Sequence, residues 1–301
     1  MNAKPALLES GNESGWGRAS DYLELAKPRV TTMVLVTTLV GFYLGDPVSP
    51  KFFTALNLLI GTALASGGTL ALNQYIEREL DALMVRTQHR PLPDHRLRPP
   101  EALWFGVVCA TAGIAYLLLT VNAFCAGITA SISIIYLLAY TPLKRVSWSC
   151  FVIGAIPGAL PPVSGWAAAR DSLSIEPWIL FTIMFLWQFP HTFAIAKMYR
   201  EDFKRAGLWL LPLDRRDDER PENPLIVAAS VALIVIGALP TLLGFAGIPY
   251  LVVSTALGMA MVFYSLALVM KPETRSAARR VMFASLIYLP IVLLAMAFDR
   301  I

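Results

Sequence analysis

The feature that most constrains this chain is a series of nine long apolar runs separated by charged connections. A helix needs about 20 mostly apolar residues to cross the hydrocarbon core of a membrane. Backbone groups in lipid must be hydrogen-bonded within the protein, and long runs without strict alternation are helices rather than barrel strands. The sequence therefore predicts an all-α integral membrane protein with nine transmembrane helices. The predicted spans are approximately 30–44, 54–72, 102–121, 124–140, 151–168, 178–196, 225–243, 249–270 and 281–298.

The composition excludes the soluble and disordered classes. Charged residues make up only 15% of the 301 residues and hydrophobic residues 56%. A soluble globular domain carries about 25% charged residues, and disordered chains are far less apolar than this one. The three cysteines show no metal-binding spacing, so we interpret them as small apolar residues.

Lys and Arg are distributed unevenly between the predicted connections. If the N-terminus is cytoplasmic, 22 of the 25 Lys and Arg residues fall in cytoplasmic segments. Cytoplasmic loops of membrane proteins carry such an excess. We therefore expect the N-terminus inside and the C-terminus outside, with residues 1–28 as a cytoplasmic segment. The net charge of +4 then belongs to the cytoplasmic face, so no nucleic-acid partner is expected.

Residues 1–28 also bear on the location of the protein. They lack the apolar core of a signal peptide, and they carry four acidic residues, which fits a mitochondrial transit peptide poorly. A prokaryotic inner membrane is therefore the expected location, with multiple spans.

The first long connection carries a regular set of oxygen ligands. Asn73, Glu77 and Asp81 are spaced four residues apart, which places them on one face of a helix, each about 6 Å above the last. We call these three residues the polar ladder. Carboxylate and amide oxygens are ligands that suit Mg²⁺. A polar amide that continues an apolar run is costly in a membrane, which favours a functional role for Asn73.

Arginines follow the polar ladder at a matching spacing. Arg86 and Arg90 are four residues apart, and acids beside arginines are typical of a site for metal-bound phosphate. The other interpretation is a solvated helix end with ordinary ion pairs, and it suits Arg78 and Glu79 best.

The second long connection contains ionisable residues within and just after an apolar run. His191 lies inside that run, and intramembrane ionisable residues are functional candidates. His191 is either a metal ligand, a hydrogen-bond donor or a structural histidine paired with a neighbouring helix. Arg200, Asp202 and Lys204 follow near the end of the helix, where Asp202 is placed to complete a metal site opposite Asp81.

Three other segments have distinctive sequences. Residues 140–145 form a short basic turn with Lys144 and Arg145, which serves either a bound anion or the positive-inside pattern. Prolines in residues 156–162 predict a break in the fifth span, which a membrane tolerates only in protein or beside a cavity. The mixed charges of residues 214–222 predict a solvated loop.

These blocks resemble the UbiA superfamily of intramembrane prenyltransferases, whose first motif has the form NxxxDxxxD. Here that motif is the polar ladder, with Glu77 at the middle position. The stretches NQYIERELDALMVRTQHRPLP, YTPLKR, IPGALPPVSGW and WQFPHTFAIAKMYREDFKRAG are similar to the branch that farnesylates haem. The likeness runs from about Glu24 to the last helix. It implies one UbiA-like prenyltransferase domain over residues 29–301, with nine helices around a central cavity.

The resemblance also implies a reaction and a site. A farnesyl group passes from farnesyl diphosphate to a vinyl group of haem b with addition of water, giving haem O for respiratory oxidases. Haem b is a substrate here, and Mg²⁺ is the cofactor. The implied metal ligands are Asn73, Glu77, Asp81 and Asp202. His191 is the candidate to orient haem or to accept a proton. The candidate clamps on the diphosphate are Arg86, Arg90, Lys144, Arg145, Arg200 and Lys204.

The branch implies further partners, and it departs from its superfamily in one respect. Membrane lipid, haem A synthase and oxidase assembly factors are the expected partners, and the active site is expected to face the cytoplasm. Members of the superfamily often have two acids in the second motif, whereas here only Asp202 occupies such a place.

Two alternative functions remain open. One is a sister prenyltransferase that acts on a quinone precursor or another ring, against which Glu77 and the stretches RTQHRPLP and WQFPH argue. The other is a haem or lipid carrier. Transporters place their polar sites near the bilayer midplane, whereas these acids cluster at one boundary beside arginines.

Overall fold

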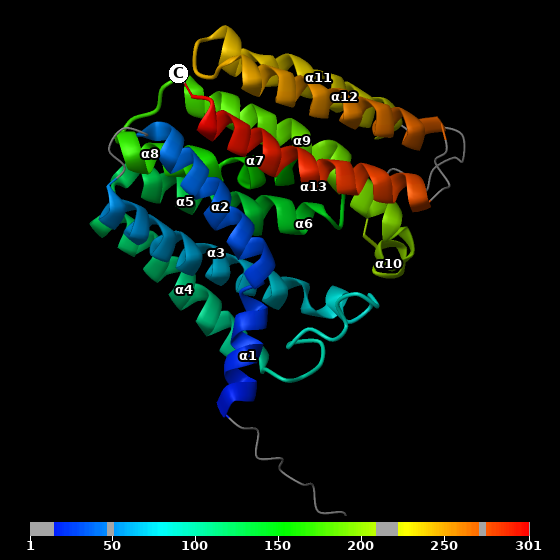
Figure 1. Cartoon of the computed structure of the whole chain (residues 1–301). Coiled ribbons are helices and arrows are strands. Elements are labelled where there is room, and N and C mark those ends of the chain that lie inside the picture. The colour runs from blue at the N-terminus through cyan, green and yellow to red at the C-terminus, as the bar shows by residue number, and fades with distance from the viewer. Residues whose placement is uncertain (1–14, 47–50, 209–221, 271–274, 301) are drawn as a thin grey trace, which may run out of the picture.

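The computed structural model describes residues 15–46, 51–208, 222–270 and 275–300, and it is almost entirely helical (Figure 1). Within these residues nine helical segments are long and apolar enough to cross a membrane, which confirms the nine predicted spans. The segments are α2 (Pro28–Gly45), α3 (Phe52–Asp81), α4 (Pro99–Thr120), α5–η1–α6 (Ala123–Leu143), α7–α8 (Cys150–Arg170), α9 (Glu176–Met198), α11 (Glu222–Leu242), α12 (Ile248–Met270) and α13 (Arg275–Phe298). Two shorter helices are α1 (Gly15–Leu25) and α10 (Arg200–Arg205).

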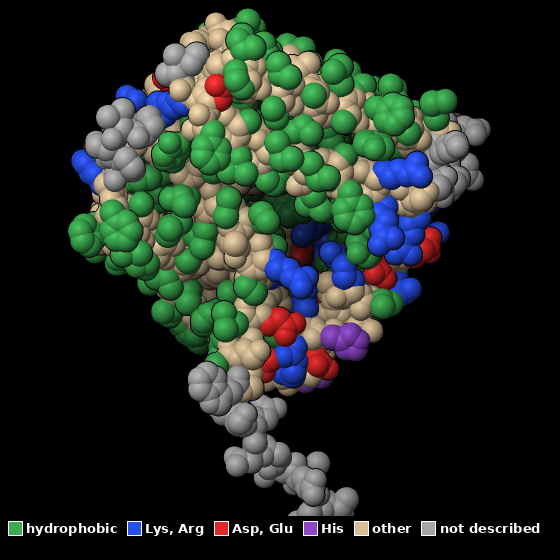
Figure 2. All heavy atoms as spheres, viewed as in Figure 1, with side chains coloured by type: hydrophobic (Ala, Val, Ile, Leu, Met, Phe, Trp, Pro, Cys, Tyr) green, Lys and Arg blue, Asp and Glu red, His purple; other side chains and the backbone are tan. Residues whose placement is uncertain are grey.

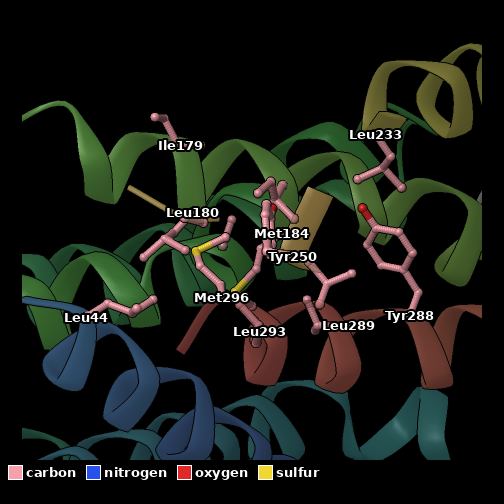
Figure 3. Packing of buried hydrophobic residues seen from close by; sticks show 14 of the residues in the cluster. Leu44, Ile179, Leu180, Met184, Leu233, Tyr250, Tyr288, Leu289, Leu293 and Met296 are labelled. Atoms are coloured by element: carbon pink, nitrogen blue, oxygen red, sulfur yellow. The ribbon is translucent and has the colours of Figure 1, made fainter. Parts of the chain in front are cut away.

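The spans are stacked in layers. Figure 1 shows α11 and α12 on one side, then α9 and α13, then α2 with α8, and finally α3 with α4. The largest apolar cluster joins α9 to α13, and Figure 3 shows Leu180 and Met184 facing Leu293 and Met296. Because lipid is as apolar as these side chains, close packing rather than burial from water holds such helices together.

Glycines allow two helix pairs to approach backbone to backbone. A Cβ atom on Gly41 of α2 would collide with the Pro162 carbonyl of α8. One on Gly68 of α3 would collide with the Ala110 backbone of α4. Small residues are the usual means by which membrane helices pack this closely. The second contact fixes α3, the helix that carries the polar ladder.

The α3 helix is longer than its apolar span. It has 30 residues and continues nine residues past Leu72, the predicted end of the span, to Asp81. At a rise of 1.5 Å per residue it is about 45 Å long, whereas the hydrocarbon core is about 30 Å thick. Its last turns therefore leave the apolar layer without a break, and the polar ladder lies on those turns.

The fifth span is interrupted where the prolines predict. Helix α7 (Cys150–Ala159) ends and α8 (Pro161–Arg170) begins on either side of Leu160. Pro157, Pro161 and Pro162 are buried among protein atoms. The break thus meets the first of the two conditions under which lipid tolerates irregular backbone.

The fourth span differs from the regular helix that the sequence predicts. Residues Ile135–Tyr140 form a π-helix, η1, between α5 (Ala123–Ile134) and α6 (Thr141–Leu143). Pro142 has no N–H, so the carbonyl four residues before it loses its helical donor. Just before that proline, the Thr141 N–H bonds to the carbonyl of Tyr136, five residues back. Single π turns of this kind are frequent at functional sites.

Candidate active site

A cavity of about 200 Å³ lies at the end of the bundle where α3 and α9 finish. We call it the ladder cavity. Residues from α3, the loop 82–98, η1, α7, α9 and α10 line it. Figure 2 shows Lys and Arg side chains gathered around a hollow on an otherwise largely apolar face. Its polar lining residues are Lys27, Asn73, Glu77, Asp81, Arg86, Arg90, Tyr136, Tyr140, Lys144 and Thr192.

All three residues of the polar ladder line this cavity. Asn73 and Asp81 are each 1% exposed, and Glu77 is 8% exposed. They share one helix face because α3 stays regular through Asp81. Buried carboxylates are unfavourable unless they are paired with a cation or a metal ion.

Each ladder residue accepts a hydrogen bond from a different cation. Lys27 Nζ lies 2.9 Å from Asn73 Oδ1, and Lys144 Nζ lies 2.8 Å from Glu77 Oε1. An Arg90 nitrogen lies 2.6 Å from Asp81 Oδ2. The three cations come from the α1–α2 junction, the turn after α6 and the loop 82–98. Segments far apart in the sequence therefore meet at one helix face.

Lys27 is a site residue that the sequence did not single out. It joins α1 to α2 with a left-handed backbone (φ 47°), a conformation that is unusual for a residue with a Cβ. The Gln74 amide donates to the carbonyls of Glu24 and Leu25, which fixes the end of α1 just before this turn. Burial, together with repulsion from Arg90 and Lys144, lowers the pKa of Lys27 to about 7. A bound anion would raise this pKa again, because an opposite charge favours the protonated amine.

Lys144 lies in an aromatic corner of the cavity. Its Nζ is 4.5 Å from the centroid of the Tyr140 ring, and the Tyr136 ring lies 5.2 Å from that of Tyr140. Burial opposes the charge of Lys144, but Tyr140 and Glu77 outweigh it, so its pKa is raised. Both tyrosines belong to η1. The sequence signal for this aromatic part of the cavity lining is the pair of tyrosines four residues apart just before Pro142.

Contacts on two sides hold the loop 82–98 in place. Arg96 pairs with Asp21 and Glu24 of α1, and the Thr87 hydroxyl donates to the Asp81 carbonyl at 2.8 Å. On the other side the Arg86 guanidinium lies 5.0 Å from the Tyr199 ring centroid. Stacking on an aromatic face orients a guanidinium without consuming its N–H donors.

The charged residues predicted at the second connection lie elsewhere. Asp202 is not among the described residues that line the cavity, and it pairs with Arg205 at 3.6 Å. Lys204 and Arg145 are exposed, and Arg200 is half-buried outside the lining. The roles expected of these residues stay predictions. The loop expected at 214–222 lies mainly outside the described residues; only its last residue, at the start of α11, is assigned to a helix.

His191 is directed toward α13. Its Nδ1 lies 2.8 Å from the Ser285 hydroxyl, and its ring stacks on Trp187 with centroids 4.7 Å apart. The next residue, Thr192, lines the ladder cavity, whereas His191 does not. Its predicted action on haem therefore requires haem to approach from the α9–α13 side.

The donors in the cavity fit a Mg²⁺ ion that is shared with a substrate. The described residues contain no group of three or more His, Cys, Asp or Glu side chains spaced to hold a metal ion. The polar ladder offers two carboxylates and one amide oxygen on one face. Mg²⁺ in proteins commonly takes one or two carboxylates and completes its shell with phosphate oxygens and water.

Comparison with known sequences shows a close likeness over most of the chain. A model of the UbiA prenyltransferase family matches residues 34–287. Protoheme IX farnesyltransferase of Solibacter usitatus (strain Ellin6076) is 43% identical over 289 residues, which cover 93% of this chain and 98% of that protein.

Solved structures share the fold. A structure of digeranylgeranylglyceryl phosphate synthase has a TM-score of 0.77 at 18% identity and covers 94% of this chain and 98% of its own. A UbiA homolog from Archaeoglobus fulgidus bound to GPP and Mg²⁺ has a TM-score of 0.63 at 16% identity, covering 92% and 99%. At sequence identities of 16% and 18%, these structures show that the fold is shared and nothing more.

Proposed function

The chain belongs to the UbiA prenyltransferase family, and we infer that it transfers a farnesyl group from farnesyl diphosphate to haem b. Water is added in the same reaction, and the products are haem O and diphosphate. The observation that carries this inference is the 43% identity, over nearly the whole chain, to a protoheme IX farnesyltransferase. The ladder cavity supplies a site with the chemistry that this reaction needs.

The diphosphate binds among the cations of the cavity. Lys27, Arg90 and Lys144 converge on one face of α3, and Arg86 is held beside them by Tyr199. Donors that are already aimed at developing negative charge stabilise a leaving group without reorganisation. These residues therefore hold the diphosphate while the bond from its oxygen to the farnesyl C1 breaks.

The polar ladder would hold Mg²⁺. A UbiA homolog of the same fold has been solved with GPP and Mg²⁺, which supports a divalent ion here. When bound, the ion supplies Lewis-acid charge to the phosphate oxygens. Glu77 and one ladder residue a turn away from it, Asn73 or Asp81, would be its protein ligands. Asp202, predicted as a fourth ligand, lies outside the cavity lining and needs a separate test.

The bond changes balance without any oxidant. The terminal carbon of a haem vinyl group attacks the farnesyl C1, and diphosphate leaves with the electron pair of the C–O bond. The positive charge then on the haem side chain is captured by water, which loses one proton and leaves a hydroxyl. We assign the orientation of haem, or acceptance of that proton, to His191. The rings of Tyr136 and Tyr140 line the ladder cavity, where they would stabilise positive charge that develops on the farnesyl C1 as diphosphate leaves.

The protein is an integral membrane protein with nine apolar spans in its described residues. We propose that it lies in a prokaryotic inner membrane with the ladder cavity on the cytoplasmic side, because the positive-inside rule favours that orientation. Both substrates have a large apolar part, so they reach the site from the lipid. Haem A synthase and oxidase assembly factors are the partners to test, since they would receive the product.

The test is an assay of the products. Purified protein in detergent is incubated with haem b, farnesyl diphosphate and Mg²⁺, and the pigments are separated by chromatography and weighed by mass spectrometry. A haem product heavier by one farnesyl group plus one water, absent when EDTA is added, is the expected result. Transfer to 4-hydroxybenzoate but not to haem would contradict the proposal in favour of a sister prenyltransferase. Transfer to neither acceptor would favour a carrier.

A further inference from the structure

A second pocket lies at the end of the bundle opposite the ladder cavity, and we call it the far pocket. The ends of α2, α11 and α13, the start of α9 and the helix α8 line it. Its volume of about 30 Å³ is room for one or two groups the size of a water molecule. Its described lining is mostly apolar, and the charged residues in it are Glu176 and Arg300. Figure 3 shows four of its apolar lining residues, Leu44, Ile179, Leu180 and Met296.

Three side chains around the far pocket each have a buried polar atom without a partner. Trp166 Nε1, Glu176 Oε2 and Arg300 Nη1 make no hydrogen bond to any described residue. Glu176 and Arg300 carry opposite charges and line the same pocket, yet these two atoms do not bond to each other. Buried donors and acceptors are costly when unpaired, so in folded proteins they bond to a ligand or to ordered water. The three atoms therefore indicate a site for a small group that both accepts and donates hydrogen bonds.

A second arginine strengthens the positive side of this site. The Cζ atoms of Arg170 and Arg300 lie 5.7 and 6.0 Å from the centroid of the Trp166 ring. Arg170 donates from Nε to the Gly45 carbonyl at 2.6 Å, and this bond does not use its two terminal nitrogens. The predicted topology places only three of the 25 Lys and Arg residues on this side of the membrane. Two of those three meet at one tryptophan, which is only 3% exposed.

The end of the chain holds Arg300 in position. The neighbouring Asp299 accepts two hydrogen bonds from the start of α12, one from the Gly247 N–H at 2.8 Å and one from the Tyr250 N–H at 2.7 Å. Arg300 itself forms an isolated antiparallel bridge with Ala246. The guanidinium is thus attached to a fixed backbone before any ligand binds, which lowers the entropy cost of binding.

We propose that the far pocket binds the headgroup of a phospholipid that carries a primary ammonium group, as in phosphatidylethanolamine. Its phosphate oxygens would accept hydrogen bonds from Arg170, Arg300 and the Trp166 N–H, and its ammonium group would donate to Glu176. One phosphate oxygen fits the enclosed volume, while the acyl chains stay in the surrounding lipid. The pocket lies where the apolar spans end, which is the depth of lipid headgroups. This inference does not depend on the proposed function.

The chemistry of the site separates this headgroup from others. Phosphatidylglycerol has the phosphate but no ammonium group, so it would leave the Glu176 carboxylate unpaired. Phosphatidylcholine has a quaternary ammonium group, which cannot donate an N–H hydrogen bond to a carboxylate. Because hydrogen bonds between charged groups are the strongest class, we expect a preference of about tenfold or more for phosphatidylethanolamine over both.

Native mass spectrometry measures this preference directly. The full chain is purified in detergent, freed of lipid and titrated with each of the three phospholipids, all with the same acyl chains. One tightly bound phosphatidylethanolamine per chain is the expected result. Equal retention of the three lipids would overturn the proposal, because it would indicate lipid that covers the apolar surface without a headgroup site. Retention of none would also overturn it and would favour water between Glu176 and Arg300.

Variants separate the two halves of the headgroup. Arg300→Met should weaken phosphatidylethanolamine and phosphatidylglycerol alike by about tenfold or more, because both lose a phosphate donor. Glu176→Gln should remove the preference between these two lipids, because an amide does not pair with an ammonium group as a carboxylate does. Lys51→Met is the matched control, because Lys51 is the third basic residue on this side, is exposed and lies outside the pocket lining. Unfolding temperatures measured without lipid identify any variant that fails to fold. A folded Glu176→Gln variant that keeps the full preference would overturn the assignment of the ammonium group.

Discussion

The two polar connections of this chain contribute different kinds of side chain to the same cavity. The first, formed by the end of α3 and the loop 82–98, brings the polar ladder and two arginines into the lining. The second, formed by the end of α9 and α10, brings mainly apolar side chains such as Ile195 and Phe203. Its charged residues, Asp202 among them, lie outside the described lining.

The difference follows from where each helix ends. Helix α3 runs unbroken to Asp81, so residues four apart stay on one face up to the boundary of the membrane. Helix α9 ends at Met198, and Tyr199 leaves helical geometry (φ −112°, ψ 24°) before α10 begins. This break rotates α10 relative to α9, so spacing along the sequence no longer predicts a shared face. The charge of the site therefore comes from the first half of the chain and much of its apolar wall from the second.

The largest effect should come from a carboxylate of the polar ladder. Glu77→Gln removes a metal ligand and the partner of Lys144, so we expect kcat/KM to fall by about 10³-fold. Glu79→Gln is the matched control on the same helix, because the Glu79 side chain is 79% exposed and pairs with its neighbour Arg78. Steady-state kinetics with haem b and farnesyl diphosphate measure both. Similar losses in the two variants would remove the distinction between the ladder face and the rest of α3.

His191 tests whether the second connection serves the haem. His191→Phe keeps the stacking on Trp187 but removes the polar ring, and we expect kcat to fall by about 10²-fold, the contribution of a positioned acid or base. The KM for farnesyl diphosphate should stay unchanged. Ser285→Ala is the comparison, because it removes only the hydroxyl beside Nδ1. A lower unfolding temperature with unchanged kcat in His191→Phe would assign this residue a structural role instead.

Substitution of Arg90 tests the contribution of the loop 82–98, which belongs to the first connection. Arg90→Met leaves Asp81 without its cation and the diphosphate without one donor, so we expect the KM for farnesyl diphosphate to rise by about tenfold to a hundredfold. Arg78→Met is the control on the side of α3 that does not line the cavity. An equal rise in KM in both variants would indicate a general surface-charge effect.

The smallest effect should come from the contact that joins the two connections. Tyr199→Leu removes an aromatic ring under Arg86, and a cation–π contact at a partly exposed site contributes about 0.5–1 kcal/mol. We therefore expect an approximately two- to fivefold loss of kcat/KM. Replacement by Phe, which keeps the aromatic face, should restore the rate. No difference between Tyr199→Leu and Tyr199→Phe would show that Arg86 does not depend on this ring.

The nine spans and the polar ladder could be predicted because each depends on a pattern that is local in the sequence. Apolar length identifies the nine spans, and the four-residue spacing of Asn73, Glu77 and Asp81 places them on one face of any regular helix. The break between α7 and α8 was likewise visible, since proline removes backbone donors. Each of these features depends only on neighbours along the chain.

Lys27 and the π turn could not be predicted in the same way. Lys27 reaches Asn73 across 46 positions of sequence, and only the left-handed turn before Pro28 directs it there. Tyr136 and Tyr140 line the cavity from η1, a π-helix in which the Thr141 N–H bonds to the Tyr136 carbonyl, five residues back. The placement of Asp202 was hidden for a related reason, because the backbone changes direction at Tyr199. Contacts made through turns depend on the tertiary structure.

The most direct test of the central claim compares one acid from each connection. Asp81→Asn and Asp202→Asn are purified together, and formation of the farnesylated haem product is measured with haem b, farnesyl diphosphate and Mg²⁺. If the polar ladder of α3 builds the diphosphate site, Asp81→Asn should lose at least about 10²-fold in kcat/KM, while Asp202→Asn stays within about fivefold of the unaltered protein. Equal losses in the two variants would contradict this prediction and would indicate that both connections supply functional residues to the same site.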